Sequence, residues 1–174
     1  LICLTVKRES LYIATEEALP EIKMRADRLN INTDIRLVPA MTGIADPGAI
    51  LLKRQPCAVV LDSLQGMIGP NEQMGVELLG NLKKYAVTLN APIIVVSHVN
   101  KSDDFAGLMT YQHAVDTLLL MSPDEDGIRT LEVQKNRYGQ AFIEQQFEMT
   151  AHGLIPVLGE DEEDEEDIED DENE

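Results

Sequence analysis

The sequence predicts an α/β fold, in which a mostly parallel sheet is flanked by helices and antiparallel strands are added at its C-terminal edge. Two fully apolar runs, residues 57–61 and 93–96, predict strands buried on both faces, as in parallel sheets. Helical periodicity lies between these runs. Three later strand-like segments are separated by the turn pairs Asp126-Gly127 and Tyr138-Gly139, which are typical of antiparallel pairing.

The first third of the chain predicts alternating strands and helices. Residues 11–15 are apolar and precede Glu16-Glu17, and a helix with one buried face should follow. Its apolar positions recur every three or four residues: Leu19, Ile22, Ala26 and Leu29. Residues 35–38 predict a short strand, residues 39–48 a loop, and the stretch before Gln55-Pro56 a short helix.

The apolar run at 57–61 ends in Asp62 and Ser63. Ligands of parallel sheets bind where the strands end. A carboxylate beside a hydroxyl at that place can hold Mg²⁺ through water in a nucleotide site, although Asp62 could also simply begin a turn.

The remaining elements follow from the same patterns. We expect a loop over residues 64–73, a helix through residue 90, a strand entered at Pro92, and a polar loop over residues 98–107. Antiparallel strands are then predicted at residues 117–121, 129–134 and 142–149.

The composition indicates one globular domain with an aliphatic core. The chain has 174 residues, no Trp and 4% aromatic residues. No apolar run reaches the roughly 18 residues needed to span a bilayer, and the first residues do not form a signal peptide. The two cysteines, Cys3 and Cys57, suggest neither disulfides nor zinc, so we expect a reducing, cytoplasmic setting.

The charge is unevenly distributed. The formal net charge is −18, and thirteen of the 32 acidic residues lie in residues 160–174. The rest of the chain carries nineteen acidic and fourteen basic residues, a net charge of −5. We therefore predict a globular domain over residues 1–158 and a disordered acidic tail over residues 159–174. The tail either keeps the protein in solution or imitates nucleic acid and binds a basic partner.

Several stretches resemble the RecA-type ATPase core of the bacterial RadA/Sms family of DNA-repair proteins. The family's second strand and helix are similar to residues 11–17 and the helix after them, and its Walker B strand is similar to residues 59–65. Its sensor strand and DNA-facing loop are similar to residues 95–101, 106–107 and 113–117. The segment that closes the family's core is similar to residues 147–150 and 153–154. Lys135-Asn136-Arg137-Tyr138-Gly139 resembles its signature pentapeptide, with Tyr138 where Phe is usual. The resemblance covers about residues 1–157.

The resemblance implies hydrolysis of ATP with Mg²⁺. In that interpretation Glu16 is the catalytic base that orients the attacking water, Asp62 with Ser63 holds the magnesium shell, and Ser97 and His98 sense the γ-phosphate. Without the family, the favoured interpretation of Glu16 is a carboxylate at a helix N-terminus, and that of His98 is a hydrogen-bonded structural residue.

The resemblance also implies partners. Lys135 and Arg137 would reach across a subunit interface toward the neighbour's nucleotide, which requires a ring and implies a homo-hexamer. Lys101 would face single-stranded or branched DNA in the central channel during homologous recombination, with a recombinase as a possible partner. The same loop carries Asp103, Asp104 and Leu108-Met109, which depart from the family's pattern and weaken the predicted DNA contact.

Other parts of the family pattern are missing. No G-x-x-x-x-G-K-[ST] phosphate loop occurs in the 174 residues, and neither does the family's four-cysteine zinc module or its Lon-like domain. The phosphate-loop strand is central in this fold, so its omission should leave unpaired strands and an exposed apolar seam.

We therefore expect a fragment of a longer ATPase. The alternative is a catalytically inactive RecA-fold interaction module whose tail binds a basic partner. A nucleotide-binding regulator related to clock or replicative-helicase ATPases leaves the pentapeptide unexplained.

Overall fold

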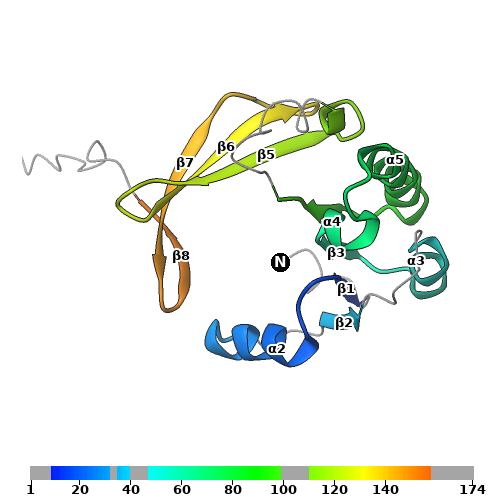
Figure 1. Ribbon diagram of the computed structural model, residues 1–174, viewed down its shortest axis with the longest axis horizontal. Coiled ribbons are helices and arrows are strands. Elements are labelled where there is room, and N and C mark those ends of the chain that lie inside the picture. The colour runs from blue at the N-terminus through cyan, green and yellow to red at the C-terminus, as the bar shows by residue number, and fades with distance from the viewer. Residues whose placement is uncertain (1–8, 32–34, 40–46, 99–109, 158–174) are drawn as a thin grey trace, which may run out of the picture.

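The computed structural model describes residues 9–31, 35–39, 47–98 and 110–157, and its first half is a parallel sheet with helices (Figure 1). The strand order is β2-β1-β3-β4, all parallel. These strands are β1 (Ser10–Ala14), β2 (Ile35–Pro39), β3 (Ala58–Asp62) and β4 (Ile93–Val96). The helices are α2 (Leu19–Arg28), α3 (Gly48–Arg54), α4 (Leu64–Ile68) and α5 (Glu72–Leu89).

The long helix α5 has defined ends. The side chain of Asn71 accepts a hydrogen bond from the backbone N–H of Met74, which satisfies one of the free donors at the helix start. Asn90 ends the helix with φ of 49°, a left-handed conformation that asparagine tolerates better than most residues. Between these ends, the face carrying Leu78, Leu79 and Leu82 is buried.

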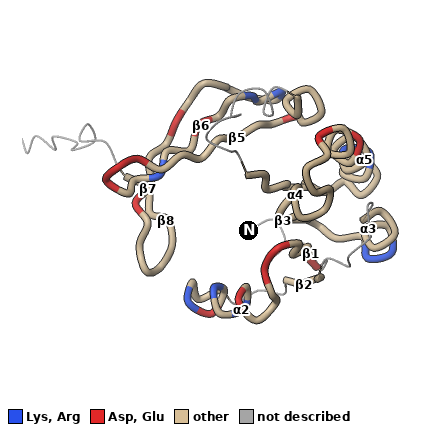
Figure 2. The backbone as a smooth tube through the Cα atoms, viewed as in Figure 1, with Lys and Arg blue, Asp and Glu red and all other residues tan. Residues whose placement is uncertain are grey.

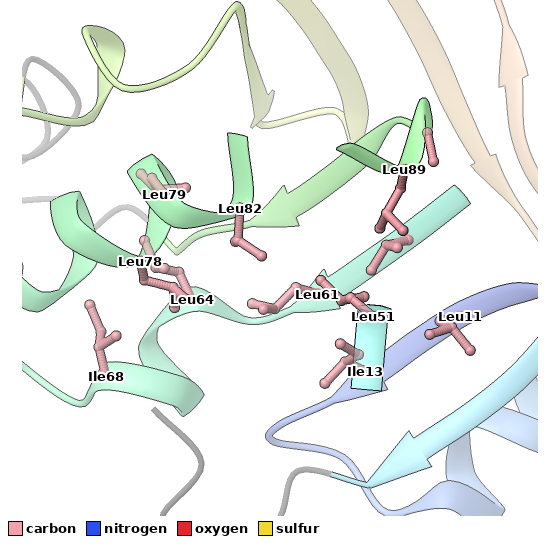
Figure 3. Close-up of a cluster of buried hydrophobic side chains, with 12 residues drawn as sticks. Leu11, Ile13, Leu51, Leu61, Leu64, Ile68, Leu78, Leu79, Leu82 and Leu89 are labelled. Atoms are coloured by element: carbon pink, nitrogen blue, oxygen red, sulfur yellow. The ribbon is translucent and has the colours of Figure 1, made fainter. Parts of the chain in front are cut away.

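One face of the parallel sheet forms the core (Figure 3). Leu11 and Ile13 of β1 and Val59 and Leu61 of β3 point to this face, and α5 together with Leu51 of α3 covers it. Burial of these aliphatic side chains stabilises the fold by about 1.5–3 kcal/mol for each side chain. The predicted aliphatic core is confirmed.

The opposite face of the sheet is less covered toward β4. Tyr12, Val60 and Ile94 are paired neighbours across β1, β3 and β4, so their side chains share this face. Tyr12 and Val60 are half-buried, whereas Ile94 is 58% exposed. Helix α2 lies on this side (Figure 1), with Ile22 as its buried residue.

The second half of the chain is a separate antiparallel sheet with the order β5-β6-β7-β8. Its strands are β5 (Thr117–Pro123), β6 (Ile128–Asn136), β7 (Glu144–Thr150) and β8 (Gly153–Pro156). The α/β fold class is confirmed, but one detail needs correction. We predicted that the antiparallel strands extend the parallel sheet, whereas in the described residues they pair only among themselves. Periodicity predicts strands and says nothing about their partners.

A second correction concerns residues 64–73, which we predicted to be a loop. Residues 64–68 form α4, because the Ser63 hydroxyl accepts a hydrogen bond from the backbone N–H of Gly66 and so caps the helix. Lys101 and its loop, together with the acidic tail, lie outside the described residues. None of the helices in the described ranges is both long enough and apolar enough to cross a membrane.

The two halves meet where α2 approaches the β7–β8 hairpin (Figure 1). Arg28, at the end of α2, donates a hydrogen bond to the carbonyl of Ala151. In the same hairpin Gly153 has φ of +113°, and a Cβ there would stand 3.2 Å from the Leu29 side chain. Glycine therefore fits this turn both by conformation and by space.

Candidate active site

Three neighbouring strands end at one edge of the parallel sheet, and polar residues follow each of them. Glu16 follows β1, Asp62 and Ser63 end and follow β3, and Ser97 and His98 follow β4. Because β1, β3 and β4 are adjacent and parallel, their carboxyl ends meet. All five of these predicted site residues are thus brought to one place. Figure 2 shows the acidic stretch that follows β1 beside this edge.

Glu16 is held by donors from the ends of β3 and β4. The Ser63 hydroxyl donates a hydrogen bond to Oε1, and Nε2 of His98 lies 3.1 Å from Oε2. An ionised carboxylate only accepts hydrogen bonds, so the imidazole nitrogen carries the proton in this contact. The hydrogen bond from Ser63, followed by the contact with His98, lowers the pKa of Glu16. Glu16 is therefore an ionised, oriented acceptor.

The turn after β3 is fixed to the turn after β1. The Thr15 hydroxyl accepts a hydrogen bond from the backbone N–H of Ser63 at 2.6 Å and donates one to the Ser63 carbonyl at 3.0 Å. The Thr15 N–H donates to the Asp62 carbonyl at 2.7 Å. Ser63 is fully buried, and the peptide bond before it is cis. The Ser63 hydroxyl consequently reaches Glu16 from a well-anchored backbone.

Asp62, the predicted magnesium residue, has a partner that the sequence did not reveal. The Tyr12 hydroxyl, from β1, donates a hydrogen bond to its Oδ2. Burial of Tyr12, followed by this hydrogen bond, raises the pKa of its phenol group, which therefore stays a neutral donor. The other oxygen, Oδ1, can still accept from metal-bound water.

The donor set suits magnesium held together with a phosphate ligand better than magnesium held by protein alone. No group of three or more His, Cys, Asp or Glu side chains in the described ranges could hold a metal. Mg²⁺ typically keeps several waters and binds through one or two carboxylates plus substrate phosphates. A single oriented carboxylate, Asp62, fits that mode of binding.

The end of β4 is tied to α4 through Gln65. Its Nε2 donates to Ser97 Oγ at 2.9 Å and to the His98 carbonyl at 3.0 Å. Its Oε1 accepts from the His98 N–H at 3.1 Å. The side chains predicted to sense a phosphate are thus placed by a residue that the sequence analysis did not single out.

Lys135 and Arg137 form a second group at the end of β6, and no hydrogen bond among the described residues joins them to Glu16. Arg137 donates to Asp116 Oδ1 at 3.1 Å, and its backbone N–H donates to the Asp116 carbonyl at 2.9 Å. Lys83 of α5 donates to the same carboxylate oxygen at 2.6 Å. Lys135 Nζ donates to the carbonyls of Gln112 and Val115. Both cations are therefore held by residues 112–116 of their own chain.

Three supporting residues were missed by sequence reasoning: Tyr12, Gln65 and Asp116. Each acts through a partner at least 21 residues away or on another strand, and such pairs leave no local spacing signal. The one available signal was that all three residues lie inside stretches that carried the family resemblance.

The antiparallel sheet exposes one apolar face. Side chains that pair across its strands share a face, and one face collects Leu119, Met121, Leu131, Val133, Phe147, Met149 and Leu154. Leu119 and Met149 are each 51% exposed, and Met121 is 46% exposed. Within the described part of the chain, this face is an uncovered apolar surface of the kind that marks a binding surface, and Ile94 on β4 is a second exposed apolar position on the other sheet.

Comparisons with known proteins agree with the motifs. The chain is similar to the DNA repair protein RadA of Escherichia coli K12, with 33% identity over 162 residues, and to that of Bacillus subtilis 168, with 34% identity over 160 residues. RadA of Rickettsia felis is 36% identical over 169 residues. These matches cover 87–90% of this chain but only 35–37% of the relatives. The chain thus spans about a third of their length. No family model matches.

A solved structure supports the fold. A KaiC-like protein from the hyperthermophilic archaeon Pyrococcus horikoshii OT3 superposes with a TM-score of 0.69 at 11% identity, covering 90% of this chain and 78% of that one. At this identity the likeness concerns the fold alone, which is RecA-type.

Proposed function

We propose that this RadA-like chain is part of the RecA-type ATPase core of a DNA-repair protein. The observation that carries the proposal is the meeting of Glu16, Asp62 and His98 at the carboxyl ends of three adjacent parallel strands. In RecA-type proteins this edge is where a nucleotide would lie. The similarity to RadA proteins over most of the chain supports the same assignment.

The proposed chemistry is positioning and charge stabilisation. Phosphoryl transfer requires little covalent chemistry from the protein. Glu16, ionised and held on both oxygens, would orient the attacking water through its remaining lone pairs. Asp62 would accept hydrogen bonds from water around Mg²⁺. When bound, ATP would supply the reacting phosphoryl group and Mg²⁺ would stabilise its negative charge. Ser97 and His98 would contact the γ-phosphate, so a change there would reach Glu16 directly.

The uncovered apolar surface supports the expectation of a fragment. Ile94 on β4 and the apolar face of the antiparallel sheet are the surfaces that an upstream strand and helix would cover. A phosphate loop on such a segment would supply the triphosphate contacts that the 174 residues lack. The chain's coverage of about a third of its relatives agrees with this proposal.

Ring assembly and DNA binding belong to the same proposal. Lys135 and Arg137 would act on a neighbouring subunit's nucleotide in a homo-hexamer, and Lys101 would contact DNA during recombination, with a recombinase as a possible partner. The globular part would be residues 1–158, with residues 159–174 as an acidic tail. The buried thiol of Cys57 fits a cytoplasmic setting.

A second function is favoured by one observation, the thirteen acidic residues within residues 160–174. A core without a phosphate loop could serve as an inactive scaffold whose tail binds a basic protein. Deletion of residues 160–174 would then abolish capture of that partner. In the ATPase proposal, the same deletion leaves ATP hydrolysis unchanged.

The decisive experiment compares Glu16→Gln with Glu17→Gln in the protein extended upstream to the start codon of its gene. The two carboxylates are adjacent, but Glu17 pairs with Arg25 and not with Ser63 or His98. We expect Mg²⁺-dependent ATP hydrolysis that falls by about 100-fold or more in E16Q and remains in E17Q. An upstream sequence without a phosphate loop, or full activity in E16Q, would refute the proposal.

A further inference from the structure

Helix α4 begins between the ends of β1 and β4, two strands that are not paired with each other. Strand β3 lies between β1 and β4, and α4 follows β3 directly. The first turn of α4 therefore stands beside Glu16 on one side and beside Ser97 and His98 on the other. Its side chains contact both.

The contacts toward β1 are close. The Ser63 hydroxyl, at the cap of α4, donates to Glu16. Gly66 lies so near this strand end that a Cβ in its place would collide with the Thr15 side chain and stand 3.1 Å from Cγ of Glu16. A glycine is what this approach requires. The first turn of α4 thus has little freedom to move relative to Glu16.

Among the described residues, the hydrogen bonds from α4 to the end of β4 are made by Gln65. Its amide uses both of its ends, since Nε2 donates to the Ser97 hydroxyl and the His98 carbonyl, and Oε1 accepts from the His98 N–H. The two hydrogen bonds to the N–H and the carbonyl of His98 resemble those that a neighbouring β-strand would make, and they fix the backbone of His98. The imidazole that contacts Glu16 is attached to this backbone, so a displacement of the backbone moves the imidazole relative to Glu16.

We propose that Gln65 is a positioning residue that couples the end of β4 to Glu16. Displacement of Ser97 or His98 by a phosphate would move the Gln65 amide, and the rigid first turn of α4 would carry that movement to Ser63 and Glu16. The coupling itself rests on the contacts described here. Its consequence for hydrolysis rests on the proposed function.

The test uses this chain and its histidine signals. Gln65→Leu removes the donor and the acceptor at similar size, and Gln73→Leu, at an exposed position on α5, is the matched control. In two-dimensional NMR of the imidazole groups, Q65L should shift the signals of His98 and leave those of His113 and His152 in place. Q73L should shift none of the three. The urea midpoint of Q65L should stay close to that of the unchanged chain, because the amide lies at the exposed end of the sheet.

A Q65L variant whose His98 signals coincide with those of the unchanged chain overturns the coupling. So does a variant in which all three histidines shift together, since that result indicates general unfolding. Glu16→Gln should move the His98 signals as well, because the two side chains are in contact.

The consequence for hydrolysis is measured separately, in the extended protein. There Q65L should lower kcat by about tenfold or more with little change in KM for ATP, since misplacement rather than loss of binding is the defect. A shift of His98 in this chain together with unchanged kcat in Q65L would retain the coupling and refute its catalytic role. Absence of hydrolysis in the unchanged extended protein would refute the proposed function alone.

Discussion

At the scale of single residues, the hydrogen bond from Ser63 lowers the pKa of Glu16. Ser63→Ala removes the largest cause of the lowered Glu16 pKa, so we expect this pKa to rise toward the ordinary value of 4.5. The same change removes the cap of α4, which costs about 1 kcal/mol of stability. A carboxyl ¹³C NMR titration of Glu16 measures the first effect and urea unfolding the second. Ser122→Ala, at an exposed position of β5, is the control, and an unmoved Glu16 titration in S63A would contradict the assignment.

Asp116 offers a second prediction at this scale, because it accepts from two cations of unequal influence. Its carboxyl pKa is lowered first by the hydrogen bond from Lys83 and less by Arg137. Lys83→Met should therefore raise the pKa of Asp116 more than Arg137→Met does. The Lys83 contribution to stability is present above the unfolded value near 3.8 and is lost as the pH falls through the lowered folded value. Urea midpoints of K83M and the unchanged chain should thus differ at pH 7 and converge at low pH. A larger rise of the Asp116 pKa in R137M than in K83M would refute the geometry.

At the scale of elements, α5 stabilises the parallel sheet through one face only. Leu82, on that face, is 3% exposed, whereas Val87 on the same helix is 77% exposed. Leu82→Ala should lower the free energy of unfolding by about 2–5 kcal/mol because it leaves a cavity against the sheet. Val87→Ala should change it by less than about 0.5 kcal/mol. Urea denaturation of the two variants measures both, and equal losses would show that α5 packs differently.

The elements that sequence reasoning found and missed differ in how clear a local pattern each one carries. Strands β3 and β4 are apolar runs between turn signals, and α5 shows three turns of periodic leucines, so local pattern sufficed. Helix α4 has five residues, too few for a period, and only the hydroxyl of Ser63 marked its start. The strands β5–β7 were predicted to be antiparallel, whereas the four-residue β8 was not predicted. Their separation from the parallel sheet depends on which edges remain open, and no local pattern encodes that.

The candidate site was predictable in part for a similar reason. Asp62 was found from the residues alone, since a carboxylate at the end of a buried strand is a local feature. Glu16, Ser97 and His98 needed the family resemblance, because a single Glu or His is usually structural. Tyr12 and Gln65 were not found, since their roles come from hydrogen bonds between strand ends that only the folded sheet brings together.

At the scale of the whole molecule, burial divides the chain. Among the described residues, every fully buried hydrophobic side chain lies between Leu11 and Ala91. The antiparallel sheet, residues 117–156, has half-buried or exposed side chains throughout and keeps an apolar face uncovered. Its attachment to the core runs through the partly buried Tyr111, Ala114 and Val115, through Asp116, which accepts from both Lys83 of α5 and Arg137, and through the contact of Arg28 with Ala151. The two sheets should therefore differ in stability.

Native-state hydrogen exchange tests this difference with a matched pair of strands. Both β3 and β6 are inner strands of four-stranded sheets and are hydrogen-bonded on both sides. Since β3 carries the fully buried Val59 and Leu61 and β6 carries none, we expect β6 amides to open at a lower free energy than those of β3. That opening should depend less on denaturant, because a partial opening exposes less surface. Equal opening free energies and equal denaturant dependence for the two strands would mean that the sheets unfold as one unit, and the coupling through residues 110–116 would then be stronger than its burial indicates.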